Sequence, residues 1–106
     1  MTCSDRVPAT LARALTAQGY HDLTPVQRAV LAVEPWDRDM LVSAPTGSGK
    51  TLAFGLALAP RLVRDDGRAS WPAPRALVVA PTRELARQVA GELARLYAET
   101  GLGILC

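Results

Sequence analysis

Residues 44–51 have the composition and spacing of a loop that binds phosphate groups. They read Ala-Pro-Thr-Gly-Ser-Gly-Lys-Thr, and Lys50 is the only lysine among the 12 lysine and arginine residues of the chain. A lysine carries a compact ammonium on a flexible stem, which can reach between phosphate oxygens where a planar guanidinium fits less well. The single departure from arginine therefore indicates a nucleoside triphosphate as the ligand of this loop.

The loop follows the general pattern Gly-x-x-x-x-Gly-Lys-Ser/Thr, with Ala44 in place of the first glycine. Gly47 and Gly49 allow turns that a side chain would obstruct, so successive N–H groups can surround a phosphate at the amino end of a helix. Lys50 is then expected to contact the β- and γ-phosphates, and the Thr51 hydroxyl to ligate Mg²⁺. A chance glycine-rich loop is the alternative, but the segment lies between a predicted strand and a predicted helix, as this chemistry requires.

Apolar spacing and capping residues predict the elements that position this loop. Three features indicate helices: leucines at helical spacing, Thr24 as a cap before Pro25, and one amphipathic stripe. Three continuous apolar runs indicate strands that are buried on both faces. The predicted helices span residues 8–18, 25–33, 49–62 and 83–100, with a kink or an end expected at Pro60. The predicted strands span 40–43, 76–80 and 102–106. Because strands alternate with helices, we expect an α/β fold with a doubly wound parallel sheet that is truncated at its third strand.

Composition and charge narrow the class of protein. The 106 residues are 49% hydrophobic and 21% charged, which suits one small packed domain. No apolar run approaches the roughly 20 residues that cross a bilayer, and no secretory signal follows Met1, so we expect no membrane partner. Cys3 and Cys106 suggest neither a disulfide framework nor a metal site, and they fit a reduced, cytoplasmic setting. The net charge of +2 is too small to argue for nucleic-acid binding by bulk electrostatics.

Three segments together resemble the motifs of DEAD-box ATP-dependent RNA helicases. Residues 19–27 resemble the Q motif of that family, residues 44–51 its motif I, and residues 81–86 its motif Ia, in the family's order and spacing. Over residues 1–106 the chain resembles the first half of the first of two RecA-like domains. The resemblance implies a partial RecA-like P-loop NTPase domain that binds ATP and Mg²⁺ and contacts RNA without sequence preference.

The resemblance assigns base recognition to Gln27 and Tyr20. In the family the glutamine pairs with the adenine edge, which needs a group that donates and accepts together, and the aromatic residue stacks on the base. From the residues alone another reading of Gln27 stays open, because Thr24-x-x-Gln27 is also a capping box in which Gln27 reaches back to the cap N–H. Tyr20 taken alone would more often be a core residue. The resemblance gives Lys50 and Thr51 a catalytic role. The implied nucleotide-binding set is Tyr20, Gln27, Ala44, Thr46, Gly47, Ser48, Gly49, Lys50 and Thr51.

Pro81, Thr82 and Arg83 are the nucleic-acid-binding residues that the resemblance implies. Motif Ia contacts the RNA sugar-phosphate backbone, to which Thr82 can offer a hydroxyl and the following helix its free N–H groups. The alternative is that Thr82 caps a helix and that Arg83 and Arg87 belong to a solvated face beside Glu84.

The chain departs from the family's pattern in two ways. No aromatic residue precedes Tyr20, although the family has one that would fall near Thr2, and Asp22 stands where a basic residue is common. Adenine discrimination is therefore expected to be weaker than usual. No Asp-Glu-Ala-Asp sequence occurs, and the acidic pair Asp65-Asp66 lies in a predicted loop. Because phosphoryl transfer needs a carboxylate to hold Mg²⁺ and orient water, we expect no ATP hydrolysis by this chain alone.

Three functional readings follow from these features. The favoured one is the N-terminal piece of an ATP-dependent RNA helicase, cut by an incomplete gene record or a truncated reading frame. A short product that binds nucleotide without catalysis is the second, and part of a helicase-like DNA translocase is the third. Residues 81–86 argue against the third, because other helicase branches differ most there.

Overall fold

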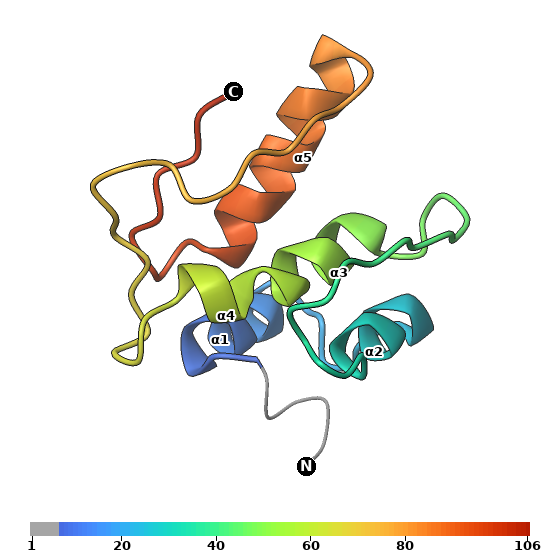
Figure 1. The fold of residues 1–106 in the computed structure, drawn as a ribbon, viewed down its shortest axis with the longest axis horizontal. Helices are drawn as coiled ribbons and strands as arrows, with labels where there is room; N and C mark the ends of the chain where they lie inside the picture. Colours follow the sequence, from blue (N-terminus) through green and yellow to red (C-terminus); the bar gives the residue numbers. More distant parts are fainter. Residues whose placement is uncertain (1–6) are drawn as a thin grey trace.

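Five α-helices and their connecting segments make up residues 7–106, the part of the chain that the computed structural model describes. The predictions made for Thr2 and Cys3 lie outside these residues. In Figure 1, α3 runs across the centre of the molecule, with α1 and α2 on one side and α5 on the other. The helices are α1 (Ala9–Ala17), α2 (Pro25–Leu31), α3 (Lys50–Ala57), α4 (Ala59–Leu62) and α5 (Arg83–Leu96).

The first two helices begin where local signals in the sequence predict. α1 begins directly after Pro8, a residue that is common at helix starts. After α1 the chain turns at Gly19, whose φ of +87° favours glycine. α2 follows a complete capping box at Thr24. The Gln27 N–H donates to Thr24 Oγ1 at 3.4 Å, and the Thr24 N–H donates to Gln27 Oε1 at 2.9 Å. The capping reading of Gln27 is therefore confirmed.

The predicted helix over residues 49–62 is divided in two, as the expected break at Pro60 implies. α3 ends at Ala57, Leu58 serves as its cap, and the short α4 follows with Pro60 in its first turn, where the missing N–H costs nothing. The predicted helix over residues 83–100 is also shorter than expected, because α5 ends at Leu96.

A buried threonine explains the early end of α5. The Thr100 N–H and Oγ1–H both donate to the Tyr97 carbonyl, at 3.0 and 2.7 Å, and the Ala69 N–H donates to the Thr100 carbonyl at 2.8 Å. These bonds turn the chain away from the helix axis and join it to the loop before residue 70.

The core lies where all five helices meet, because each helix presents apolar side chains to its neighbours. Within α5 only the carboxyl half contributes: Leu93 and Leu96 are buried, whereas Leu85 is 43% exposed. The amino half of α5 therefore projects away from the core, as Figure 1 shows. The core residues are Leu11, Leu15, Leu31, Leu52, Leu56, Ala59, Leu62, Leu96 and Tyr97.

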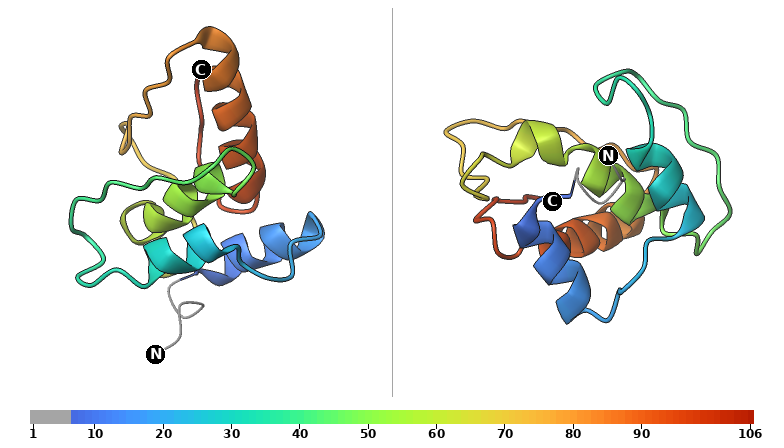
Figure 2. Two further views of the ribbon diagram at one scale, coloured as in Figure 1. Left: turned by 90° about the vertical axis from the view of Figure 1, so that its right-hand side faces the viewer. Right: turned by 90° about the horizontal axis from the view of Figure 1, so that it is seen from below.

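The predicted doubly wound parallel sheet is wrong for this structure. Residues 7–106 form no β-strand, and no backbone hydrogen bond joins any of the segments 40–43, 76–80 and 102–106. Residues 40–43 and 76–80 lie in irregular connections between helices, and residues 102–106 form the irregular C-terminal end (Figures 1 and 2). Their central leucines, Leu41, Leu77 and Leu105, are 99%, 87% and 99% exposed.

The physical reason for this difference lies in what an apolar run reports. A continuous apolar run indicates that burying the segment lowers the free energy. A strand needs in addition a neighbouring strand whose backbone pairs with its N–H and C=O groups. In residues 7–106 the three runs find no such neighbour in each other. Among the described residues, no helix has the length and apolar character needed to cross a membrane.

Candidate functional site

The glycine-rich segment forms a turn that leads directly into α3. Gly47 and Gly49 have φ of +84° and +85°, and the Ser48 N–H donates to the Pro45 carbonyl at 3.2 Å. Gly49 is the N-cap residue of α3, and its carbonyl accepts the first bond of the helix, from the Ala53 N–H at 3.0 Å. The turn needs a left-handed conformation at both positions. Glycine occupies them because other residues adopt this conformation only at a cost of about 1–2 kcal/mol.

The amino end of α3 carries the residues predicted to hold phosphate. Lys50 is the first residue of the helix and is exposed, and Thr51 is half-buried behind it. The first four N–H groups of a helix have no partner within it, so they give this end a partial positive charge that the Lys50 ammonium increases. The arrangement suits a phosphate group placed over the loop.

A buried hydroxyl in the loop is consistent with this use. Ser48 Oγ is buried, and it has no hydrogen-bond partner among residues 7–106. Burying a hydroxyl without a partner costs free energy, and an anion seated in the turn is one group that would satisfy it. The loop glycines, the helix end and this hydroxyl therefore fit a nucleotide phosphate.

Gln27 is joined to the loop by a contact that its place in the sequence does not reveal. Its side-chain nitrogen Nε2 donates to the Gly49 carbonyl at 3.3 Å, while Oε1 accepts from the Thr24 N–H. The residue is only 4% exposed. Each end of the amide thus already has a protein partner, and one Nε2 hydrogen and one Oε1 lone pair are left for a base.

Gly49 is required at this contact for a second reason besides its φ. A Cβ atom at that position would lie 2.5 Å from Gln27 Nε2 and 3.3 Å from Thr24 Oγ1. The amino end of α2 and the amino end of α3 can therefore approach this closely only because residue 49 has no side chain.

Tyr20 is placed at the surface, in the turn that follows α1. Its N–H donates to the Leu15 carbonyl at 2.9 Å, and its side chain is 51% exposed. Taken alone, Tyr20 is expected to be a core residue, and this expectation is wrong. The exposed ring is free to stack on a base, but the described residues supply no hydrogen bond or ring contact that fixes it against the loop.

Thr82 caps α5, and its neighbours in residues 81–83 are exposed. Thr82 Oγ1 accepts from the Leu85 N–H at 3.1 Å, which confirms the capping alternative for this residue. The hydroxyl can still donate its hydrogen, and the first N–H groups of the helix have no partner within it. Capping and contact with a phosphate are therefore compatible here.

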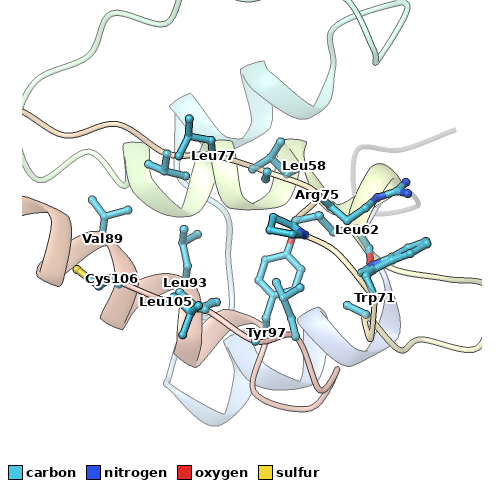
Figure 3. Close-up of a pocket in the computed structure, with 18 of the residues that line it drawn as sticks. Leu58, Leu62, Trp71, Arg75, Leu77, Val89, Leu93, Tyr97, Leu105 and Cys106 are labelled. Carbon is cyan, nitrogen blue, oxygen red and sulfur yellow. The ribbon is translucent and has the colours of Figure 1, made fainter.

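An apolar cavity lies elsewhere in the structure. It has a volume of about 670 Å³ and is lined mainly by apolar side chains of α4, α5 and the two segments 69–80 and 102–106. Leu77, Val89, Leu93 and Leu105 point into it in Figure 3. No residue of the glycine-rich loop lines this cavity, so it is not the candidate nucleotide site.

Potential metal ligands are sparse. Within residues 7–106 no three histidine, cysteine, aspartate or glutamate side chains gather where they could hold a metal ion. His21 and the pair Asp65-Asp66 are exposed, as a loop position predicts.

Comparison with known proteins matches these features to one family. The model of the DEAD/DEAH box helicase family matches residues 24–106. DEAD-box ATP-dependent RNA helicase 3A, chloroplastic, of Zea mays is 47% identical over 90 residues, which are 82% of this chain and 12% of that protein. ATP-dependent RNA helicase DbpA of Escherichia coli (strain K12) is 51% identical over 89 residues, 84% of this chain and 18% of that protein.

A solved structure follows a similar backbone path. The RNA-helicase Prp28 from Chaetomium thermophilum, crystallised with bound ADP, superposes with a TM-score of 0.78 and 34% identity over 93% of this chain and 24% of that chain. This chain thus spans 12% and 18% of the lengths of the two curated relatives above. The motif spacing, the family match and the shared backbone path agree, and the chain belongs to the DEAD/DEAH box helicase family.

Proposed function

We propose that this chain binds ATP through the loop before α3 and the amide of Gln27. The observation that carries the proposal is the Gln27 Nε2 to Gly49 carbonyl bond of 3.3 Å, since it joins the residue expected to read adenine to the loop expected to hold phosphate. The related Prp28 was crystallised with bound ADP, which supports a nucleotide as the ligand. Tyr20 remains a prediction for stacking on the base.

Within the proposed site, the chain's own residues bind and orient. The N–H groups of residue 47 and residues 49–51, together with the Lys50 ammonium, would hold the β- and γ-phosphates, and the Thr51 hydroxyl would hold Mg²⁺. Mg²⁺, when bound, neutralises charge on the outer phosphates. Ser48 Oγ, buried and without a partner among the described residues, is available to donate to a phosphate oxygen.

We further propose that residues 81–83 contact the sugar-phosphate backbone of RNA. Support comes from the exposed amino end of α5, whose first-turn N–H groups and Arg83 present positive charge. Relatives named as RNA helicases make RNA the favoured polymer. Such contacts carry no sequence information, so binding without a defined sequence is expected.

For the complete protein we propose ATP-dependent separation of RNA strands in the cytoplasm. This chain would supply ATP binding and part of the RNA contact. Hydrolysis is not proposed for the 106 residues alone, because the sequence contains no Asp-Glu-Ala-Asp segment to hold Mg²⁺ and orient water.

Titration of a fluorescent ATP analogue against Lys50→Ala tests the nucleotide site. Loss of a charge-assisted hydrogen bond costs about 1.5–3 kcal/mol, so affinity should fall roughly 10- to 100-fold. Lys50→Arg keeps the charge and is the matched control for shape. It should also lose affinity if a point charge is needed. Unchanged affinity in Lys50→Ala, with an unchanged far-UV circular dichroism spectrum, would sink the assignment.

A further inference from the structure

Three arginines gather around two tryptophans on a surface that the proposed function does not use. The guanidinium carbons of Arg64 and Arg75 lie 4.1 and 4.0 Å from the centroid of the Trp71 ring. Figure 3 shows Arg75 beside Trp71 at the end of the apolar cavity. The guanidinium carbon of Arg61 lies 5.6 Å from the centroid of the Trp36 ring. We call Trp36, Arg61, Arg64, Trp71 and Arg75 the basic-aromatic surface.

The two guanidiniums at Trp71 must lie on opposite faces of its ring. A guanidinium about 4 Å from a ring centroid covers the centre of that face, so a second one at the same distance has no room beside it. The ring therefore separates two positive charges by a constant distance. The Trp71 Nε1–H donates to the Leu62 carbonyl at 2.7 Å, which holds the ring itself in place.

Backbone contacts hold the arginines in position as well. The Arg64 side chain donates to the Ser70 carbonyl at 3.0 Å, Arg75 to the Arg61 carbonyl at 3.4 Å, and Arg61 to the Asp37 carbonyl at 3.3 Å. Long side chains on a surface normally lose conformational entropy when they bind a ligand, and here part of that loss has already occurred.

No carboxylate of residues 7–106 forms an ion pair with the arginines of this surface. Among residues 7–106, Arg61, Arg64 and Arg75 form no ion pair within 4.0 Å. Each guanidinium has five N–H donors, and within the described part of the chain one of them donates to a backbone carbonyl. Of the acidic residues nearby in sequence, Asp66 accepts from the Arg68 N–H at 3.0 Å. Most of the donor capacity is therefore turned toward solvent.

We propose that the basic-aromatic surface is a second contact site for single-stranded RNA, separate from residues 81–83. Two guanidiniums at a constant separation suit an anion with regularly spaced charges, which a sugar-phosphate backbone provides. Trp36 is 40% exposed, which leaves part of its ring open for an unpaired base to stack. Pairing of charge with an open aromatic ring distinguishes single-stranded RNA from an acidic protein. The inference rests on the proposed RNA-binding function.

Fluorescence anisotropy of the 106-residue chain with labelled 15-nucleotide oligouridine, between 50 and 200 mM NaCl, tests the inference. Arg64→Gln and Arg75→Gln should each weaken binding severalfold and reduce the slope of log affinity against log salt by about 0.7, the value for one phosphate contact on a single strand. Arg13→Gln is the matched control. Its charge is already paired with Glu99 at 3.0 Å, so it should change neither quantity.

Two substitutions at Trp71 separate positioning from charge. Trp71→Leu leaves the net charge unchanged but releases both guanidiniums, so affinity should fall toward that of Arg75→Gln. Trp71→Phe keeps a ring for stacking and should retain most of the affinity. Equal binding by Trp71→Leu and the unchanged chain would overturn the positioning argument.

The remaining outcomes distinguish this inference from the proposed function. If Arg83→Gln weakens RNA binding while Arg64→Gln and Arg75→Gln do not, the second site is wrong and residues 81–83 stand. If the unchanged chain does not bind the oligonucleotide, both proposals fail. Binding of poly-glutamate as tight as that of RNA, and equally sensitive to Arg75→Gln, would make the surface a general anion site and contradict the inference.

Discussion

Gln27 and Gly49 are 22 residues apart in sequence, yet the Gln27 amide donates to the Gly49 carbonyl at 3.3 Å. The same amide accepts from the Thr24 N–H at 2.9 Å, so one side chain joins the start of α2 to the loop before α3. A change in the conformation of the loop should therefore shift Gln27, the residue proposed to contact adenine. A substitution at Gln27 should likewise alter the conformation of the loop.

Gln27→Glu should weaken both folding and nucleotide binding. The carboxylate can still accept from Thr24, but it cannot donate, so a buried negative oxygen would face the Gly49 carbonyl. Leaving buried groups unsatisfied costs about 1–3 kcal/mol of unfolding free energy. Urea denaturation at pH 7 measures this loss.

Gln18→Glu is the control for Gln27→Glu. Gln18 Nε2 also donates to a backbone carbonyl, that of Ala14 at 3.1 Å, but the residue is exposed at the end of α1. It should cost less than about 0.5 kcal/mol. Equal losses for the two variants would contradict a special role of the Gln27 contact.

Gly49→Ala should destabilise the protein more than Gly47→Ala. Both glycines have φ near +85°, so both substitutions carry a similar strain of about 1–2 kcal/mol. At Gly47 a Cβ would meet nothing within 4 Å, whereas at Gly49 it would lie 2.5 Å from Gln27 Nε2. The difference between their urea midpoints therefore isolates the contact between α2 and the loop, and no difference would mean that Gln27 moves aside freely.

Gly55→Ala and Gly91→Ala should change stability in opposite directions, although both lie within helices. A Cβ at Gly55 would be 2.8 Å from Leu93 Cδ2 and 2.9 Å from Leu96 Cδ2, in a packed core, whereas at Gly91 its nearest neighbour is the Arg95 side chain at 3.8 Å. Overpacking costs about 1–3 kcal/mol, which outweighs the roughly 1 kcal/mol that alanine gains over glycine in a helix. Thermal melts should therefore show a lower midpoint for Gly55→Ala and a higher one for Gly91→Ala.

Tyr97→Phe should remove part of the sensitivity of the fold to alkaline pH. The Tyr97 hydroxyl donates to the Gly55 carbonyl at 2.7 Å, and burial raises the pKa of this hydroxyl above its ordinary value. Because the folded pKa is the higher one, the neutral hydroxyl stabilises the fold fully below about pH 10, and this contribution is lost as pH rises further.

The comparison of Tyr97→Phe with the unchanged chain is made at two pH values. At pH 7 the variant should be less stable by about 1 kcal/mol, from the lost hydrogen bond. Above pH 10 the gap should narrow, because the phenylalanine cannot ionise in the unfolded chain. Tyr20→Phe, at a position that is 51% exposed, serves as the control and should keep the alkaline loss. A gap that stays constant with pH would contradict this assignment.

Substitutions in the apolar segments should reduce self-association. Leu77 and Leu105 line the cavity yet are 87% and 99% exposed, which leaves apolar surface and unpaired backbone groups open to a second molecule. Leu77→Asp should lower the concentration-dependent increase in mass seen by analytical ultracentrifugation. Thr46→Asp, at an exposed loop position, is the control for added charge. A chain that stays monomeric at high concentration without any substitution would contradict the expectation.

Sequence alone determined the features that depend on residues close together in the chain. The capping box at Thr24, the start of α3 after Gly49, the break before Pro60 and the cap at Thr82 all follow from bonds or dihedral angles within four residues. The motifs of the family are local in the same way, and they sufficed to identify it.

Tertiary structure decided every feature that needs a distant partner. Apolar runs at residues 40–43, 76–80 and 102–106 predicted a sheet, but pairing depends on a neighbouring strand, and in residues 7–106 none is formed. The bond from Gln27 to Gly49 and the arginines stacked on Trp71 could not be predicted from local sequence either. Local preference sets how a segment can bend, whereas hydrogen bonds and stacking between distant segments depend on how the helices pack.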